Sequence, residues 1–190
     1  MTTGKGRFTL ELTMEEGSKE SFTLLARYNR GVNEKLEGLI KTLSPEEWDR
    51  NLGGYFPSVH SLCNHLVAGD YIWLRRIRPC FAFKSLSPAY FSREISFQEE
   101  KVLESPADYL ARRPELDGII TDMVGEIRRE DLSKTVSFTN VRGLRFERRL
   151  EVILIHLFNH QTYHRGMLSL YLELLGREND YSSLYPYAPA

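Results

Sequence analysis

Two histidines stand where leucines are expected in a helical segment over residues 148–175. Apolar residues recur in this segment at alternating steps of four and three, which places them on one face of a helix. That face comprises Ile153, Leu157, His160, His164, Met167, Tyr171 and Leu174. Such a face is normally buried, so His160 and His164 must find hydrogen-bond partners in the core or bind an ion. An unsatisfied buried polar group costs about 1–3 kcal/mol.

A third histidine has the same kind of position on a second predicted helix, over residues 58–77. His65 replaces an apolar residue on the face that also carries Leu62 and Gly69. Histidines four residues apart stand one helical turn from each other, so His160 and His164 can reach one ion. His65 from a facing helix would complete three nitrogen ligands with open positions, as in catalytic metal sites. Histidines that are only hydrogen-bonded within the core remain the alternative.

The composition is typical of a globular domain. The chain has 190 residues, of which 42% are hydrophobic and 27% charged. We therefore predict one domain over residues 1–190 with a sizeable core. Lys and Arg total 25 against 26 for Asp and Glu, which gives a formal net charge of -1. This balance lacks the clustered positive charge of nucleic-acid-binding proteins, so we expect no nucleic-acid partner.

The sequence shows no signal for a membrane or for secretion. No apolar run approaches the ~20 residues of a membrane span, and no apolar signal core follows the basic residues of the amino terminus. The two cysteines, Cys63 and Cys80, lack the C-x-x-C spacing and suit a reducing compartment. We expect a cytoplasmic protein that makes no membrane contact.

Four segments with helical periodicity predict an all-α fold. The first carries an apolar stripe of Leu25, Tyr28, Val32, Leu36, Leu39 and Leu43. The second covers about residues 58–77, and the fourth covers residues 148–175. The third begins at Ser105 and contains Pro114, which we expect to kink the helix or to split off its first turn.

Two other segments separate these helices. Residues 134–149 change to a period of two around Asn140 and Gly143, which predicts a short hairpin. Residues 79–104 are too long for a bare loop, and we expect them to lie across the helices as a lid. Their aromatic residues are Phe81, Phe83, Tyr90, Phe91 and Phe97. The whole pattern predicts an antiparallel four-helix bundle with a long crossover connection and a small β-hairpin before the last helix.

Three stretches of the chain resemble the DinB-like (DinB/YfiT) metalloprotein family. They are HLFNHQTYHRG over residues 156–166, NHLVAGDYIWLRR over residues 64–76, and FTNVRG over residues 138–143. The resemblance implies a single DinB-like four-helix-bundle domain, often a homodimer. It also implies a divalent ion, zinc or nickel, held by His65, His160 and His164. One departure is Met167, because the family often has Gln at that position; it lies beyond the ligands.

The resemblance also implies a chemistry. Characterised relatives include S-transferases that use low-molecular-weight thiols such as bacillithiol or mycothiol, and a mycothiol-dependent isomerase. A bound ion with open positions can lower the pKa of a water or a thiol. We therefore predict a metal-dependent thiol S-transferase or a related hydrolase-type enzyme that acts on a small molecule. A non-catalytic metal-binding stress-response or sensor protein is one alternative, and a domain with a vestigial site is another.

The remaining polar residues near the histidines have structural interpretations, and no catalytic residue is identified. Gln161 stands where a metalloprotease would have its Glu. Asp70 lies about 140° around the helix from His65, so we expect it to pair with an arginine on the helix surface. Cys63 points about 200° away from His65, as expected of a small core residue.

Two further histidines and one arginine have no assigned chemistry. His60 and His156 match no ligand position, and we interpret them as surface residues or as neighbours of the ligands. Arg165 either orients an anionic group or braces the helices. Trp48 and Trp73 are expected to anchor helix ends in the core.

Overall fold

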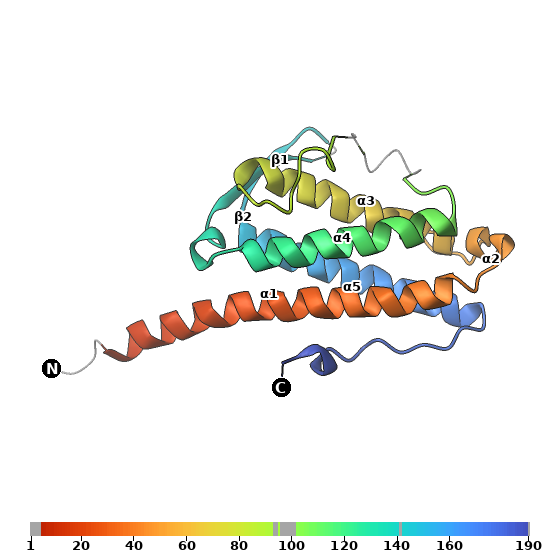
Figure 1. The fold of residues 1–190 in the computed structure, drawn as a ribbon, viewed down its shortest axis with the longest axis horizontal. Coiled ribbons are helices and arrows are strands. Elements are labelled where there is room, and N and C mark those ends of the chain that lie inside the picture. The colour runs from red at the N-terminus through yellow and green to blue at the C-terminus, as the bar shows by residue number, and fades with distance from the viewer. Residues whose placement is uncertain (1–4, 93–94, 96–101, 141, 190) are drawn as a thin grey trace.

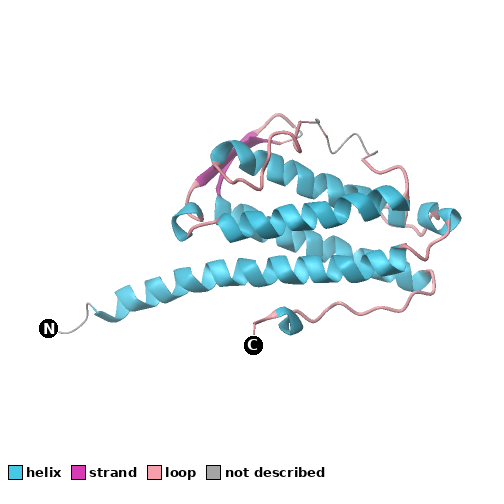
Figure 2. Ribbon diagram, in the orientation of Figure 1, coloured by secondary structure: helices cyan, strands magenta, loops and turns pink. Residues whose placement is uncertain are grey.

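The computed structural model describes residues 5–92, 95, 102–140 and 142–189. Over these residues the chain forms five α-helices and one two-stranded antiparallel sheet (Figures 1 and 2). The elements are α1 (Lys5–Ile40), α2 (Pro45–Asp49), α3 (Val59–Ile77), α4 (Pro106–Glu126), β1 (Thr135–Thr139), β2 (Arg145–Arg149) and α5 (Leu150–Leu174). The prediction of a mainly helical fold with a hairpin before the last helix is confirmed.

The four long helices pack side by side around one apolar core. α1 and α3 each pack against both α4 and α5 (Figure 1). The core includes Val32, Leu36, Ile40, Leu62, Leu66, Leu74, Leu116, Ile120, Leu154, Leu157, Leu168 and Leu172. Over the described residues, none of the helices combines the length and the apolar character that crossing a membrane requires.

Serine caps begin three of the helices. The hydroxyls of Ser44, Ser58 and Ser105 each accept a hydrogen bond from the backbone N–H three residues later. Pro45 and Pro106 occupy the first helical position after two of these caps, where a missing N–H costs nothing. These caps fix where α2, α3 and α4 begin.

The hairpin leads directly into the helix that carries two of the histidines. Its strands pair Phe138 with Phe146, and the positive φ of Gly143 allows the turn between them. The backbone N–H of Leu150 donates to the carbonyl of Lys134 at 2.8 Å, so the first residue of α5 is tied to the base of the hairpin. This bond sets where α5 starts.

Of the two expected effects of Pro114, a kink or a split first turn, the structure excludes the split. α4 continues from Pro106 to Glu126 with Pro114 inside it. The side chain of Pro114 is exposed, so the missing hydrogen bond faces solvent. The ion pair between Arg113 and Asp117, at 2.9 Å, also bridges successive turns across the proline.

Leu174 is exposed, although its spacing predicts a core position. α5 ends at this residue, and Leu175 is buried in its place. Gly176 follows with a positive φ, as expected of a residue that terminates a helix. The predicted stripe drifts around the helix, because alternating steps of four and three average 3.5 residues rather than the 3.6 of a helical turn. The buried face of the last two turns therefore comprises Leu168, Tyr171, Leu172 and Leu175, and Leu174 faces solvent.

The connection between α3 and α4 is only partly described, and Phe97 lies outside the described residues. Phe91 is buried and packs against Tyr71 of α3, with ring centroids 5.1 Å apart. At the end of the connection, the backbone N–H groups of Val102 and Leu103 donate hydrogen bonds to the side-chain oxygen of Asn64 on α3. Both described ends of the connection are thus fastened to α3.

A buried ion network joins three of the long helices. Arg113 of α4 lies 2.7 Å from the carboxylate of Asp70 and also donates to Asp117. Asp117 accepts further hydrogen bonds from the amides of Asn29 and Asn33 on α1. Asp70 does pair with an arginine, but the expected surface location is wrong because the pair is fully buried. Buried charges are tolerated when they are paired and hydrogen-bonded in this way.

Arg165 extends the network to α5. Its guanidinium donates to the side-chain oxygen of Asn29 and lies 5.1 Å from the centre of the Tyr28 ring. The side chain is buried. Of the two roles considered for Arg165, the structure therefore favours bracing α5 against α1.

Glu37 gives the network a pH-dependent contribution to stability. Burial, reinforced by the charge of Asp117, raises the pKa of Glu37 to about 7. The unfolded chain loses this proton near its ordinary pKa of about 4.5, so between these values only the folded chain keeps it. The free energy of unfolding should therefore fall as the pH rises from about 4.5 to 7.

We expect Glu37→Gln to be more stable than the wild type at pH 8, by roughly 1–3 kcal/mol, with a much smaller difference at pH 5. Urea unfolding at the two pH values measures this difference. Glu34→Gln, at an exposed site on the same helix, is the matched control and should change the free energy of unfolding by less than about 0.5 kcal/mol. An equal effect of Glu37→Gln at both pH values would contradict the assignment.

Candidate metal centre

The three predicted histidines meet between α3 and α5. One ring nitrogen from each of His65, His160 and His164 lies within 4.8 Å of the others. The Nε2 atoms of His65 and His160 are 2.9 Å apart. Among the described residues, this is the one group of three or more His, Cys, Asp or Glu side chains that are close enough to share an ion. Three imidazoles are a donor set that suits zinc and nickel.

Gly69 gives His160 the space to reach His65. It lies one turn after His65 on α3, directly opposite the His160 ring. A Cβ atom at this position would stand 2.9 Å from Cε1 of His160, closer than van der Waals contact allows. The ring of His160 therefore occupies space that glycine at position 69 leaves open, and a larger residue there would force the ring to shift.

The environment keeps the three imidazoles neutral. Burial, followed by the neighbouring imidazoles, lowers the pKa of His65 to about 4 and that of His160 to about 3. Burial also lowers the pKa of His164, whose Nδ1 atom has no hydrogen-bond partner among the described residues. Neutral imidazoles are the form that binds metals, and the unpartnered buried nitrogen fits a site built for an ion.

Phe56 covers part of the cluster. Its ring stacks on His65 at a centroid distance of 4.3 Å and meets His164 edge-on at 5.4 Å. Tyr171 of α5 holds this loop in place, because its hydroxyl bonds to the backbone carbonyls of Gly53 and Phe56. A side chain at Gly54 would collide with the same hydroxyl at 2.7 Å. The loop before α3 is thus hydrogen-bonded to α5, the helix that carries His160 and His164.

Two exposed tyrosines lie beside the cluster. Tyr55 packs edge-on against Phe56 and is 88% exposed. Tyr163 is also exposed and meets His164 edge-on at a centroid distance of 5.0 Å. Exposed aromatic rings therefore lie next to Phe56 and His164.

The other two histidines do not belong to the group. His60 bridges Asp49 and the backbone carbonyl of Leu103, at 2.7 and 2.9 Å, and stacks on Trp48. His156 is exposed and packs against Trp73, with ring centroids 4.8 Å apart. Both roles are structural.

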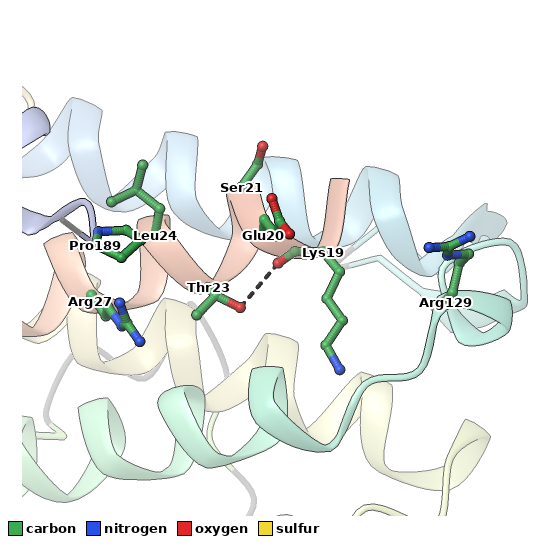
Figure 3. A pocket seen from close by; sticks show the side chains of 8 residues that line it. All are labelled: Lys19, Glu20, Ser21, Thr23, Leu24, Arg27, Arg129 and Pro189. Carbon is green, nitrogen blue, oxygen red and sulfur yellow. Dashed lines mark hydrogen bonds between the residues drawn. The ribbon is translucent and has the colours of Figure 1, made fainter. Parts of the chain in front are cut away.

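Two surface hollows lie apart from the cluster. One, shown in Figure 3, follows the outer side of α1, where Thr23 donates a hydrogen bond to the carbonyl of Lys19. Its lining comprises Lys19, Glu20, Ser21, Thr23, Leu24, Arg27, Arg129 and Pro189. The other lies between α1, α5 and the C-terminal segment and includes Arg165 and Asn179. None of the three clustered histidines lines either hollow.

The sequence model of the DinB family matches residues 14–186, a span that includes all three histidines. The chain belongs to the DinB family. It is also similar to the protein DinB of Bacillus subtilis (strain 168), with 26% identity over 154 residues, which are 80% of this chain and 84% of that protein. The family assignment made from the histidine motifs is therefore confirmed.

Sequence reasoning missed the loop that covers the histidines of this DinB-family chain. Phe56 and Tyr171 are 115 residues apart and meet only in the folded chain. The local signal was the Gly53–Gly54 pair followed by two aromatic residues and then the cap of α3. Adjacent glycines are typical of a tight turn, because glycine adopts a positive φ without steric cost, and both Gly53 and Gly54 do so.

The close fit at Gly69 leads to a prediction. We expect Gly69→Ala to push the His160 ring out of the cluster and to weaken zinc binding by roughly 10–100-fold. Competition with a chromophoric chelator measures this affinity. Gly118→Ala on α4 is the matched control, because its Cβ would meet nothing within 4 Å.

Gly118→Ala should leave zinc affinity unchanged and stabilise the fold by up to about 1 kcal/mol through its helix propensity. Unchanged zinc affinity in a folded Gly69→Ala variant would contradict the proposed packing of His160.

Proposed function

We propose that the chain binds one divalent ion, zinc or nickel, through His65, His160 and His164, and that it is a metal-dependent thiol S-transferase or a related hydrolase-type enzyme. The observation that supports this is the convergence of three neutral imidazoles between α3 and α5. When bound, such an ion supplies the means to hold a small thiol as its thiolate at neutral pH. The three side chains would hold the ion and leave positions for a thiol.

The surroundings favour thiol transfer over hydrolysis. Hydrolysis needs a group that accepts a proton from water. Among the described residues, no carboxylate belongs to the histidine cluster. Gln161 is buried in the core, and Asp70 is engaged by Arg113. A thiol has a much lower pKa than water, so it can release its proton to the solvent without a base in the site.

The aromatic surface indicates what kind of molecule would approach. Phe56 contacts two of the histidine rings, Tyr55 packs against Phe56, and Tyr163 packs against His164. These rings would exclude water and contact an apolar electrophile, while the histidines hold the ion that orients the thiol. We propose a low-molecular-weight thiol as co-substrate and a small apolar molecule as its acceptor.

We extend the proposal to the arrangement of the helices, the partners and the cellular location. The four long helices would form the antiparallel four-helix bundle with the long crossover expected of this family, as one domain. A net charge of -1 supports a protein with no nucleic-acid partner. The two cysteines are free, in keeping with a cytoplasmic location.

A non-catalytic metal-binding sensor is the second candidate. The ring of Phe56 lies directly on His65 and is fixed there by the Tyr171 hydroxyl. A ring held in this way would restrict the approach of a thiol and an electrophile together. The ion would then stabilise the fold without turnover.

The deciding experiment is a thiol-transfer assay on metal-loaded protein. We expect nickel- or zinc-loaded wild type to accelerate thioether formation between bacillithiol or mycothiol and an aryl halide by about tenfold or more over the metal-free protein. His160→Ala should abolish the acceleration. His156→Ala, a histidine on the same helix outside the cluster, is the control and should retain it.

Absorption spectra of the nickel-loaded protein separate the two candidates. Nickel–thiolate charge-transfer bands with turnover would support the enzyme. The same bands without turnover would contradict it and favour the sensor. No bands and no turnover would eliminate the thiol chemistry altogether.

A further inference from the structure

Arg76, in the last turn of α3, is a half-buried cation that stacks on aromatic rings. The central carbon of its guanidinium lies 4.6 Å from the centre of the Trp73 ring and 4.8 Å from that of Phe138. These two rings are inclined at 76°, so the guanidinium occupies the corner between them. Among the described residues it forms no ion pair, and burial is the one cause that shifts its pKa, downwards. No described carboxylate therefore balances this charge.

The edge of the Arg76 guanidinium is available to a ligand. One of its N–H groups donates to the backbone carbonyl of Thr139 in β1, at 3.1 Å. None of the others is buried without a partner, so they are open to solvent. A guanidinium that is covered on its faces presents these N–H groups in one plane, which matches the two oxygens of a carboxylate.

The hairpin supplies a second cation on the same side. β1 packs against α3 and β2 against α5 (Figure 1). Phe138, Phe146 and Arg148 share one face of the hairpin, because alternate residues of a strand point to opposite faces. The two phenyl rings stack 5.7 Å apart, and the guanidinium of Arg148 lies 5.4 Å from the Phe146 ring. Arg145 and Glu147 pair with each other on the opposite face. The face toward α3 thus carries an arginine and no carboxylate.

The two arginines lie on the surface that also holds the histidine cluster. Arg76 follows Gly69 by seven residues, so it stands on the same face of α3, about 10 Å further along the helix axis. Gly69 is directly opposite the His160 ring. His156 only fills the space between, because its ring packs on Trp73 and on His160 at centroid distances of 4.8 and 5.8 Å. A molecule about 10 Å long can therefore reach from the cluster to Arg76.

We propose that Arg76 and Arg148 form a subsite for a carboxylate of the small molecule that binds at the histidine cluster. This inference rests on the proposed function, under which that molecule is a thiol, and it narrows the co-substrate to a thiol that bears a carboxylate. An extended tripeptide is about 10 Å long, which matches the separation of the two sites. The thiol end would lie at the histidines, and the anionic end would accept hydrogen bonds from the guanidinium of Arg76.

A purely structural role of Arg76 predicts a different outcome. Its contacts with Trp73 and Thr139 tie the hairpin to α3, so Arg76→Gln could also lower the stability of the fold. Arg148 separates the two roles, because its side chain is exposed and donates only to the carbonyl of the adjacent Glu147 among the described residues. Arg148→Gln should therefore weaken carboxylate binding without unfolding the hairpin.

Binding of the carboxylate can be measured without a metal–thiol bond. S-methylglutathione carries carboxylates but no free thiol, and its dimethyl ester lacks the carboxylates. The chain has two tryptophans, Trp73 beside Arg76 and Trp48, which stacks on His60 at the opposite end of α3. In an NMR titration at low salt, S-methylglutathione should shift the indole N–H signal of Trp73 and leave that of Trp48 in place.

The ester should shift neither signal. Arg148→Gln should weaken the binding of S-methylglutathione by about threefold or more, and Arg76→Gln by about tenfold or more. Arg145→Gln, on the opposite face of the hairpin, is the matched control and should bind as the wild type does. No shift of the Trp73 signal, or the same shift with the ester, would overturn the subsite.

Nickel–thiolate bands of the nickel-loaded protein then connect the subsite to the thiol. We expect glutathione to produce these bands at a concentration about tenfold lower than glutathione dimethyl ester does. Arg76→Gln should remove this preference, and Arg145→Gln should keep it. Equal concentrations for the acid and the ester would overturn the proposal. A Trp73 shift without bands from either thiol would contradict the thiol chemistry of the proposed function and still support the carboxylate subsite.

Discussion

At Gly69 the helices α3 and α5 approach so closely that a single methyl group would displace the His160 ring. This approach allows an imidazole of one helix to stand 2.9 Å from an imidazole of the other. Desolvation in the same interface keeps the rings uncharged, so their nitrogens can face one point without repulsion. The chemistry proposed for the site depends on this contact, because histidines spaced further apart could not share an ion.

The core contains two groups of polar side chains, a charged network and a neutral histidine cluster, which have different roles. The charged network around Arg113 ties α1, α3 and α4 together, and Arg165 adds α5 to it. The neutral histidine cluster joins α3 and α5 alone. Because the network fixes the helices independently of any ligand, the three imidazoles are held in place before an ion arrives. Such preorganisation reduces the ordering that binding would otherwise require.

The histidine cluster could be predicted from the sequence, but the residues that surround it in the fold could not. Helical periodicity is local, so it could show that His160 and His164 replace apolar residues on one face. The cover of the cluster depends on contacts over long separations, such as Phe56 with Tyr171, and no local pattern encodes these. The same reason explains why Asp70 was expected at the surface, since Arg113 reaches it from another helix. Leu174 was misplaced because the predicted steps of four and three average 3.5 residues, so the stripe drifts away from the buried face of a helix with 3.6 residues per turn.

The most direct test of the account is the metal content per chain, measured by plasma mass spectrometry after purification without chelator or a histidine-rich tag. The account predicts about one zinc or nickel ion per wild-type chain. That ion should be lost in folded His160→Ala and His164→Ala variants and retained in His156→Ala. A wild type that binds neither metal after reconstitution, or variants that keep the full metal content, would contradict the assignment of these histidines.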